Sequence, residues 1–305
     1  MSIKLTDVSY TYSPSTPFSY EALKKVNLEI KDHVFLALIG ETGSGKSTLV
    51  QHLNGLLLPT AGTVQVDHYL LKTEGKKRIY IDLNKKEDKK AFKKRKQFDL
   101  KELRKYAGLV FQFPEYQLFE ETVIKDVAFG PKNFGADDKK AEEMAAAALK
   151  LVGLDSSYFE RSPFELSGGE KRRAAIAGII ALEPKVLILD EPTAGLDPQG
   201  EKEMMALFQR IYEAGTSIII VTHNMDLVLK YVQTAAVMSH GELLKIATPL
   251  SLFQDEDFLK NTAIEPPYVF KVALELKKKS LNLDLNEVKD IPSLVSQIKK
   301  AGESK

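Results

Sequence analysis

Gly40-Glu41-Thr42-Gly43-Ser44-Gly45-Lys46-Ser47 is the stretch from which the architecture of the chain can be worked out, because it fits the pattern G-x-x-x-x-G-K-[ST]. The apolar run Phe35–Ile39 before it is too short for a helix, and a helical pattern extends from Lys46 through Leu53, Leu56 and Leu57. Glycines between a strand and a helix let backbone N–H groups wrap a phosphate, and the helix N-terminus adds its positive end. The sequence therefore predicts a site for nucleotide phosphates.

Two side chains of this loop are expected to carry its chemistry. Lys46 neutralises the β- and γ-phosphates of a nucleoside triphosphate, and the hydroxyl of Ser47 ligates Mg²⁺. The residues expected to bind ATP with Mg²⁺ are Gly40, Thr42, Gly43, Ser44, Gly45, Lys46, Ser47 and Thr48.

An acidic pair follows a second apolar strand, residues 186–189. Asp190 is expected to hold Mg²⁺, directly or through water, and Glu191 to polarise the attacking water. An isolated acidic pair is more often a solvated strand end, but together with the phosphate loop it indicates hydrolysis of the triphosphate. A helical segment at 199–214 and a further strand, Ser217–Val221, complete a β-α-β unit of a parallel sheet.

The third motif is Leu166-Ser167-Gly168-Gly169-Glu170, followed by a helical run from Lys171 through Ile180. Ser167 stands where a helix N-cap is expected, and its hydroxyl, the unhindered glycine amides and the helix dipole form a second anion site. A second anion site would be redundant in a chain that already has a phosphate loop, unless it binds a different phosphate group.

With this motif the sequence resembles the ATP-binding cassette (ABC) ATPases, whose signature reads LSGGQ. Glu170 replaces the usual glutamine and leaves Ser167 and the glycines intact. The resemblance covers residues 1 to about 250 and implies a dimer, in which the loop at 40–48 of one chain and Ser167, Gly168 and Gly169 of another enclose each ATP.

Further positions match the family in order. Gln112 in VFQFP matches the glutamine that touches Mg²⁺ and water, Asp197 lies in a segment that resembles the D-loop, and His223 in VTHN matches the switch histidine. The resemblance implies that Glu191, His223, Gln112 and Lys46 are catalytic, and that Ser47, Gln112 and Asp190 hold the metal. Tyr12 resembles the aromatic residue that stacks on adenine. Tyr10, two residues earlier on the same strand face, is the rival for that role.

Three segments resemble the ATPases of energy-coupling factor (ECF) importers for vitamins or transition metal ions: QFPEYQLFEE, which begins at Gln112, the loop SPSTPFSYEAL, and the helical tail beyond residue 250. The resemblance implies three partners, namely a second, different ATPase chain, a transmembrane coupling subunit and a substrate-binding membrane subunit. It also implies a peripheral protein on the cytoplasmic face of the cell membrane.

The expected fold is α/β, a P-loop NTPase of the ABC type. Its core is a mixed, mostly parallel sheet, accompanied by an N-terminal antiparallel β subdomain, with strands around Ile3–Val8 and Val26–Ile30, and by a helical subdomain at about 113–165. A helix is expected at 136–152, with Gly153 after it. We expect a nucleotide-binding domain at 1–250 and a helical extension at 251–305 that contacts the other subunit of the dimer.

Composition limits the alternatives. The chain of 305 residues has 43 basic and 42 acidic residues and no cysteine, which excludes thiolate metal sites, disulfides and cysteine nucleophiles. Its start lacks the apolar core of a signal peptide, and its apolar runs are short of the length that spans a bilayer. Net charge gives no reason to expect nucleic-acid binding.

One segment is locally basic. Residues 72–105 hold 15 basic against 6 acidic residues, which is typical of a solvated hairpin with a lysine-rich helical turn. Contact with anionic lipid or nucleic acid is the sharper interpretation. Because this basic segment could contact nucleic acid, an alternative function stays open, that of a soluble ABC ATPase that acts on nucleic acid or ribosomes. A non-enzymatic scaffold is a further alternative, against which Glu191 and His223 argue.

Overall fold

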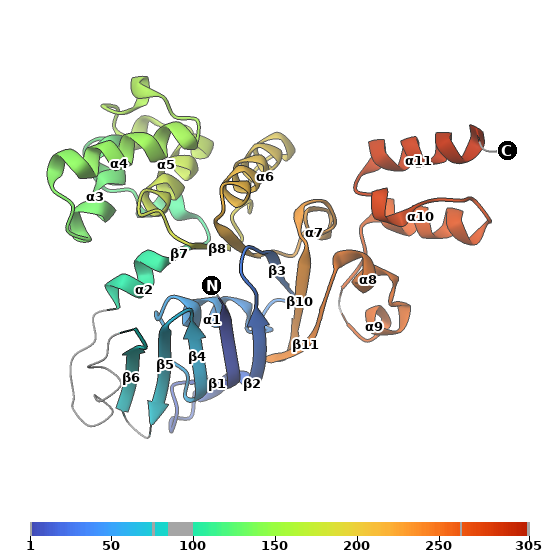
Figure 1. The fold of residues 1–305 in the computed structure, drawn as a ribbon, viewed down its shortest axis with the longest axis horizontal. Helices are drawn as coiled ribbons and strands as arrows, with labels where there is room; N and C mark the ends of the chain where they lie inside the picture. Colours follow the sequence, from blue (N-terminus) through green and yellow to red (C-terminus); the bar gives the residue numbers. More distant parts are fainter. Residues whose placement is uncertain (1, 75–76, 85–99, 263, 304–305) are drawn as a thin grey trace.

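The computed structural model describes residues 2–74, 77–84, 100–262 and 264–303, and Figure 1 shows how they are arranged. Two β-sheets lie side by side, one group of helices lies beside β7 and β8, and a second group lies beyond α7 at the carboxyl end. The lysine-rich helical turn expected within residues 72–105 falls largely at 85–99, outside the described residues.

The first sheet is antiparallel, with strand order β2-β1-β4-β5-β6. The register of β1 against β2 places Ile3 opposite Ile30 and Val8 opposite Val26, so the apolar alternation in the sequence marks both strands correctly. The strands are β1 (Ile3–Tyr12), β2 (Tyr20–Ile30), β4 (Ala61–Val66), β5 (Tyr69–Glu74) and β6 (Lys77–Asp82).

The second sheet has the order β11-β10-β3-β9-β8-β7 and is parallel except for β11, which runs antiparallel to β10. Its strands are β3 (Phe35–Ile39), β7 (Ala107–Val110), β8 (Val186–Asp190), β9 (Ser217–Val221), β10 (Thr234–Ser239) and β11 (Glu242–Ala247). The predicted β-α-β unit is confirmed, because β8 and β9 are adjacent and parallel with α6 (Pro198–Glu213) between them in the chain.

The core of the molecule lies on both faces of this second sheet. Along β3, Phe35, Ala37 and Ile39 belong to one apolar cluster, whereas Leu36 and Leu38 belong to the other. Alternate residues of a strand point to opposite faces, so the sheet is covered on both sides, as parallel sheets are. The antiparallel sheet and α1 (Lys46–Leu53) share the cluster of Leu36, and helices share the cluster of Phe35.

Helices α3, α4 and α5 pack against one another and form the group drawn in green in Figure 1. Asp137 caps α4 by accepting a hydrogen bond from the backbone of Lys140, and Gly153 follows its end with φ +83°. The elements that follow the antiparallel sheet are α2 (Lys101–Tyr106), η2 (Pro114–Gln117), α3 (Val123–Asn133), α4 (Asp138–Leu151), η3 (Ser156–Tyr158), η4 (Pro163–Glu165), α5 (Gly168–Ile180) and α7 (Met225–Tyr231).

One boundary expected from the sequence is wrong. Helix α1 ends at Leu53 and does not continue to Leu57. Gly55 has φ +70°, a left-handed conformation that ends a helix, so Leu56 and Leu57 lie in the following loop.

The carboxyl-terminal helices share the core of the rest of the molecule. They are α8 (Pro249–Gln254), α9 (Glu256–Lys260), α10 (Tyr268–Lys278), η5 (Leu285–Glu287) and α11 (Ile291–Glu303). Phe253 and Phe270 are fully buried in the same apolar cluster as Phe35, and Lys230 of α7 forms an ion pair with Asp290 at 2.7 Å. None of the helices in the described part of the chain combines the length and apolarity that crossing a bilayer requires.

Candidate functional site

The phosphate loop connects β3 to α1 through glycines in conformations that other residues adopt only with strain. Gly40, Gly43 and Gly45 have φ values of +145°, +82° and +99°. A Cβ atom on Gly40 would lie 2.0 Å from the carbonyl oxygen of Met238 on β10. Glycine at position 40 is therefore a requirement of the close approach between the loop and the neighbouring strand.

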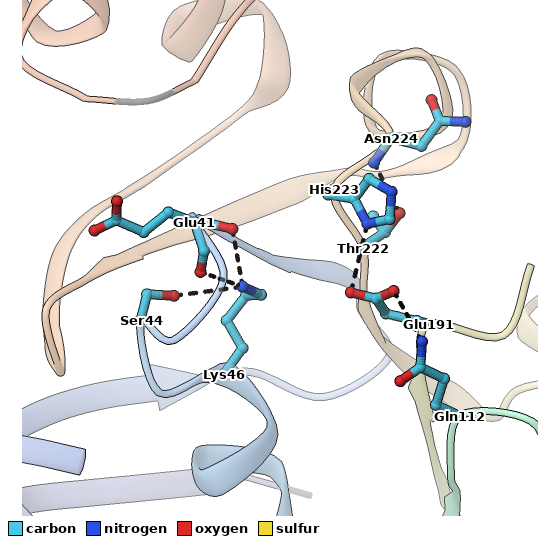
Figure 2. Close-up of polar contacts among 9 residues, drawn as sticks. Glu41, Ser44, Lys46, Gln112, Glu191, Thr222, His223 and Asn224 are labelled. Atoms are coloured by element: carbon cyan, nitrogen blue, oxygen red, sulfur yellow. Dashed lines mark hydrogen bonds and ion pairs between the residues drawn. The ribbon is translucent and has the colours of Figure 1, made fainter. Parts of the chain in front are cut away.

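Lys46 folds back into this loop, as Figure 2 shows. Its Nζ donates hydrogen bonds to the carbonyl oxygens of Gly40 at 2.8 Å and Glu41 at 2.7 Å, and lies 3.4 Å from Oγ of Ser44. Burial lowers the pKa of Lys46, and the nearby carboxylates of Glu191, Asp190 and Glu41 oppose that shift. A positive charge is thus held inside a ring of backbone groups, where an anion can replace the carbonyls as its partner.

Asp190 ends β8 and is buried. Burial raises its pKa, with a further increase from Glu191, while the hydrogen bond with Ser47 and the charge of Lys46 act in the opposite direction. A carboxylate and a hydroxyl in contact beside the phosphate loop fit Mg²⁺, which takes one or two protein ligands and completes its octahedron with water and phosphate oxygens. Ser47 and Asp190 are therefore suited to hold the ion.

Glu191 lies between two side chains that come from different strand ends, as Figure 2 shows. Its Oε1 is 3.4 Å from Nδ1 of His223, and its Oε2 is 3.4 Å from Nε2 of Gln112. The backbone N–H of Glu191 donates to the carbonyl of Val221 at 3.0 Å, although the residue has φ +48°. The tip of β8 thus presents a carboxylate whose two oxygens each have a polar neighbour, a group suited to accept a proton from a nearby water.

The signature residues form a separate site at the start of α5. Oγ of Ser167 caps the helix, and Oε2 of Glu170 accepts from the backbone N–H of Ser167 at 2.8 Å, so the two residues make a capping box. Glu170 therefore supports the helix start, as the glutamine of the usual signature can. Asp197 caps α6 by accepting from the N–H of Gly200 at 2.9 Å.

Ser167, Gly168, Gly169 and Asp197 line one open hollow of about 500 Å³. The phosphate loop contributes no described residue to this hollow. The structure therefore brings Lys46, Asp190, Glu191, Gln112 and His223 together and leaves the signature residues in a place of their own.

The two candidate tyrosines for adenine differ in environment. Tyr12 is 37% exposed, and its hydroxyl shares a hydrogen bond of 3.2 Å with Oγ1 of Thr48 on α1. The Tyr10 ring packs edge-on against Tyr12 and His52. Tyr12 has the more accessible ring beside the phosphate loop.

Two residues of the site were not anticipated from the sequence. The hydroxyl of Tyr20 donates to the carbonyl of Gly43 at 3.3 Å, and the guanidinium of Arg172 is buried beside the loop that follows Glu191. No pattern in the sequence marks Tyr20. The position of Arg172 on α5, four and eight residues before the buried Ile176 and Ile180, was the available signal that its side chain points inward.

Comparison with known proteins identifies the family of the chain. The family model described as "ABC transporter" matches residues 23–194. The chain is 46% identical to the energy-coupling factor transporter ATP-binding protein EcfA2 of Spiroplasma kunkelii, covering 99% of this chain and 93% of that protein. It is 47% identical to the protein of the same name from Streptococcus sanguinis (strain SK36), covering 95% of this chain and 99% of that protein.

Solved structures lead to the same family. CbiO1 from Clostridium perfringens, part of the ABC transporter complex CbiONQ, has a TM-score of 0.67 and 35% identity, covering 91% of this chain and 96% of that one. A dimeric ATP-binding cassette in a post-hydrolysis state, bound to ADP and phosphate, has a TM-score of 0.63 and 27% identity, covering 81% of this chain and 98% of that one. This chain belongs to the ABC transporter ATPase family, among the energy-coupling factor transporter ATP-binding proteins.

Proposed function

We propose that this chain binds and hydrolyses ATP to power an ECF-type importer of vitamins or transition metal ions. The observation that carries the proposal is the oriented carboxylate of Glu191, held between Gln112 and His223 beside the buried Lys46. Similarity to ECF ATP-binding proteins over nearly the whole chain supports the assignment to an ECF-type transporter.

Nucleotide binding follows from the loop geometry. The backbone N–H groups at 40–48 surround the phosphates, Lys46 exchanges its carbonyl partners for phosphate oxygens, and Tyr12 stacks on adenine. Ser47, Asp190 and Gln112 would hold Mg²⁺, which would supply charge neutralisation at the transferred phosphoryl group.

Hydrolysis depends on Glu191. Its carboxylate accepts a proton from the attacking water, Gln112 positions that water, and His223 keeps the carboxylate in place and stabilises charge at the γ-phosphate. Each of these three groups lies at or just beyond the end of a strand, so the sheet sets their distances.

A second ATPase chain completes each ATP site. Support comes from the separation of the signature hollow from the phosphate loop within one chain. Ser167, Gly168, Gly169 and Asp197 then face the ATP held by the partner, and ATP favours the closed dimer because it binds that state more tightly. We assign 1–250 to nucleotide binding, with a helical subdomain at about 113–165, and 251–305 to a dimer contact.

Membrane association occurs through partners at the inner, cytoplasmic face. Aromatic side chains are exposed on and beside η2 and α3: Phe113, Tyr116, Phe119 and Phe129. The Phe119 and Phe129 rings contact each other with centroids 4.9 Å apart. We call these four residues the aromatic group. Exposed aromatic side chains that gather in this way are typical of protein interfaces, and this group suits the transmembrane coupling subunit. A substrate-binding membrane subunit then selects the solute.

Purification of the tagged chain from detergent-solubilised membranes of its own source, with mass spectrometry of bound proteins, tests the proposal. A second ATPase, a shared hydrophobic subunit and small membrane proteins are expected. The variant Tyr116→Asp/Phe119→Asp should lose the membrane proteins, whereas Leu244→Asp, at an exposed position of β11, should keep them. Recovery of ribosomes or nucleic acid without membrane proteins would establish the alternative function instead.

A further inference from the structure

Arg172 is a charged side chain buried between two segments of the site. It lies in the second turn of α5 and is 3% exposed. Its Nε and Nη2 donate to the two carboxylate oxygens of Glu115 at 3.0 and 2.7 Å. Its Nη1 donates to the carbonyl oxygens of Pro192 at 3.2 Å and Ala194 at 2.7 Å.

One guanidinium therefore joins two parts of the chain that are distant in sequence. Glu115 belongs to η2, the turn that directly follows Gln112 and carries Tyr116, which is 84% exposed. Pro192 and Ala194 belong to the loop that directly follows Glu191. The guanidinium carbon also lies 5.6 Å from the ring centroid of Phe113, so the contact reaches the residue next to Gln112.

The loop after Glu191 needs such support. Glu191 has φ +48°, a left-handed conformation that costs a residue with a side chain about 1–3 kcal/mol, so its surroundings must hold it. On one side the N–H of Glu191 is fixed by the carbonyl of Val221. After Glu191, the hydrogen bonds from Arg172 to the carbonyl oxygens of Pro192 and Ala194 fix the backbone one and three residues later.

The chemistry of the contact demands arginine. A planar guanidinium can hold a carboxylate with two parallel hydrogen bonds and still offer N–H groups to other acceptors, whereas an ammonium cannot match that fork. An ion pair that is buried also resists water and salt, so it keeps the two segments together as long as both partners remain charged.

We propose that Arg172 is a positioning residue for ATP hydrolysis, which holds the backbone beyond Glu191 and ties its place to the exposed turn at Glu115 and Tyr116. The inference rests on the proposed function, since it assigns Glu191 to the hydrolytic step. Movement of the turn, where the membrane partner is proposed to dock, is transmitted to the catalytic loop through this side chain, alongside the contact of Gln112 with Glu191.

The test compares steady-state ATP hydrolysis by the full chain, with the partners that co-purify, for wild type and Arg172→Met. The kcat is expected to fall on the order of 10- to 100-fold, because Glu191 loses its alignment. The KM for ATP is expected to change less than kcat. Arg172 also lines the hollow of the signature residues, but its hydrogen bonds go to Glu115, Pro192 and Ala194 and none goes to the phosphate loop.

Three further variants separate positioning from folding. Arg172→Lys should recover part of the lost kcat, since an ammonium can keep one of the two links. Glu115→Gln retains the bonds to Pro192 and Ala194, so its kcat should fall less than that of Arg172→Met. Arg161→Met is the matched control, because Arg161 is an exposed arginine of the same helical group that donates to the carbonyl of Ser157 at 2.9 Å. It should behave as wild type.

Hydrogen exchange provides a readout that overall destabilisation does not mimic. In Arg172→Met, amide protons at 191–197 should exchange faster while those of β3, β8 and β9 keep their protection. If that variant does not fold, Arg172→Met/Glu115→Leu removes the unpaired carboxylate and is measured in its place.

Two results separate this inference from the proposed function. In the first result, wild type hydrolyses ATP and Glu191→Gln does not, but the folded Arg172 variants keep the kcat of wild type and its rate of amide exchange at 191–197. Arg172 then has only a structural role, and the inference is wrong. If wild type itself neither binds nor hydrolyses ATP, the proposed function fails first.

Discussion

Nδ1 of His223 lies 3.4 Å from Oε1 of Glu191, although 32 positions separate the two residues in the chain. The register of the parallel strands β8 and β9 explains the contact, because it pairs Asp190 with Val221. Glu191 is the next residue beyond β8, and His223 is the second residue beyond β9. The parallel arrangement brings both side chains to the same edge of the sheet, where Gln112, just beyond β7, also lies.

Glu191→Gln should lower the rate of ATP hydrolysis by about 100-fold or more and leave ATP binding intact. The amide keeps the shape of the side chain and loses its basicity, and general base catalysis contributes on the order of 10²–10⁴-fold. Phosphate release and equilibrium ATP binding are the two measurements. Glu213→Gln, at an exposed position near the end of α6, is the matched control and should keep full activity. Undiminished hydrolysis by Glu191→Gln would remove Glu191 from the mechanism.

Gly40→Ala should damage the phosphate loop far more than Gly43→Ala. The methyl group at position 40 would meet the Met238 carbonyl at 2.0 Å, so the backbone has to move. At position 43 the space is open, and only the positive φ resists the substitution. We expect a loss of about 3–4 kcal/mol in the free energy of unfolding for Gly40→Ala and about 1 kcal/mol for Gly43→Ala. Denaturant titrations without nucleotide measure both, and equal losses would contradict the packing argument.

Tyr12→Ala should weaken ATP binding by about tenfold, because stacking of an aromatic ring on a base contributes roughly 1–3 kcal/mol. Tyr12→Phe keeps the ring and should bind ATP nearly as well as wild type, despite losing the contact with Thr48. Isothermal titration calorimetry with ATP distinguishes the variants. Tyr10→Phe serves as the control. If Tyr10→Ala, and not Tyr12→Ala, carried the tenfold loss, Tyr10 would be the adenine platform.

His52 predicts a pH dependence of stability. The ring is fully buried, its Nδ1 contacts the carbonyl of Thr48 at 2.7 Å, and burial lowers the pKa of His52 to about 4. The unfolded chain takes up the proton near the ordinary pKa of about 6.5, and the folded chain does so only near 4. The stabilisation is therefore complete above pH 6.5 and is lost as the pH falls from 6.5 to 4.

Between pH 7 and pH 5, this group should remove about 2 kcal/mol from the free energy of unfolding. His52→Leu has no proton to take up, so its stability should fall by about that much less over the same interval. Urea titrations of both proteins at pH 7, 6 and 5 provide the comparison. Parallel decreases in the two proteins would show that His52 does not titrate as its burial requires.

Local features of the site follow from the amino-acid sequence alone, since they depend on residues that are close in the chain. The strand, loop and helix around Lys46, the capping role of Ser167 and the acidic end of β8 all stand where the sequence patterns predict them. Resemblance to a known family added Gln112 and His223, which as single polar residues carry no signal of their own. The end of α1 was misplaced, because the apolar Leu56 and Leu57 continue a helical pattern that the backbone of Gly55 interrupts.

Contacts between distant segments were decided by the tertiary structure. Strand order and register bring Gln112, Glu191 and His223 to one edge of the sheet, and neither can be read from local periodicity. Arg172 and Glu115 are 57 positions apart, and both are charged residue types that usually lie in solvent. The fold brings them together as an ion pair in which Arg172 is buried and Glu115 is partly buried. The amino-acid sequence therefore determined which chemical groups the site possesses, and long-range packing decided which of them touch, because loop closure and burial are properties of the whole chain.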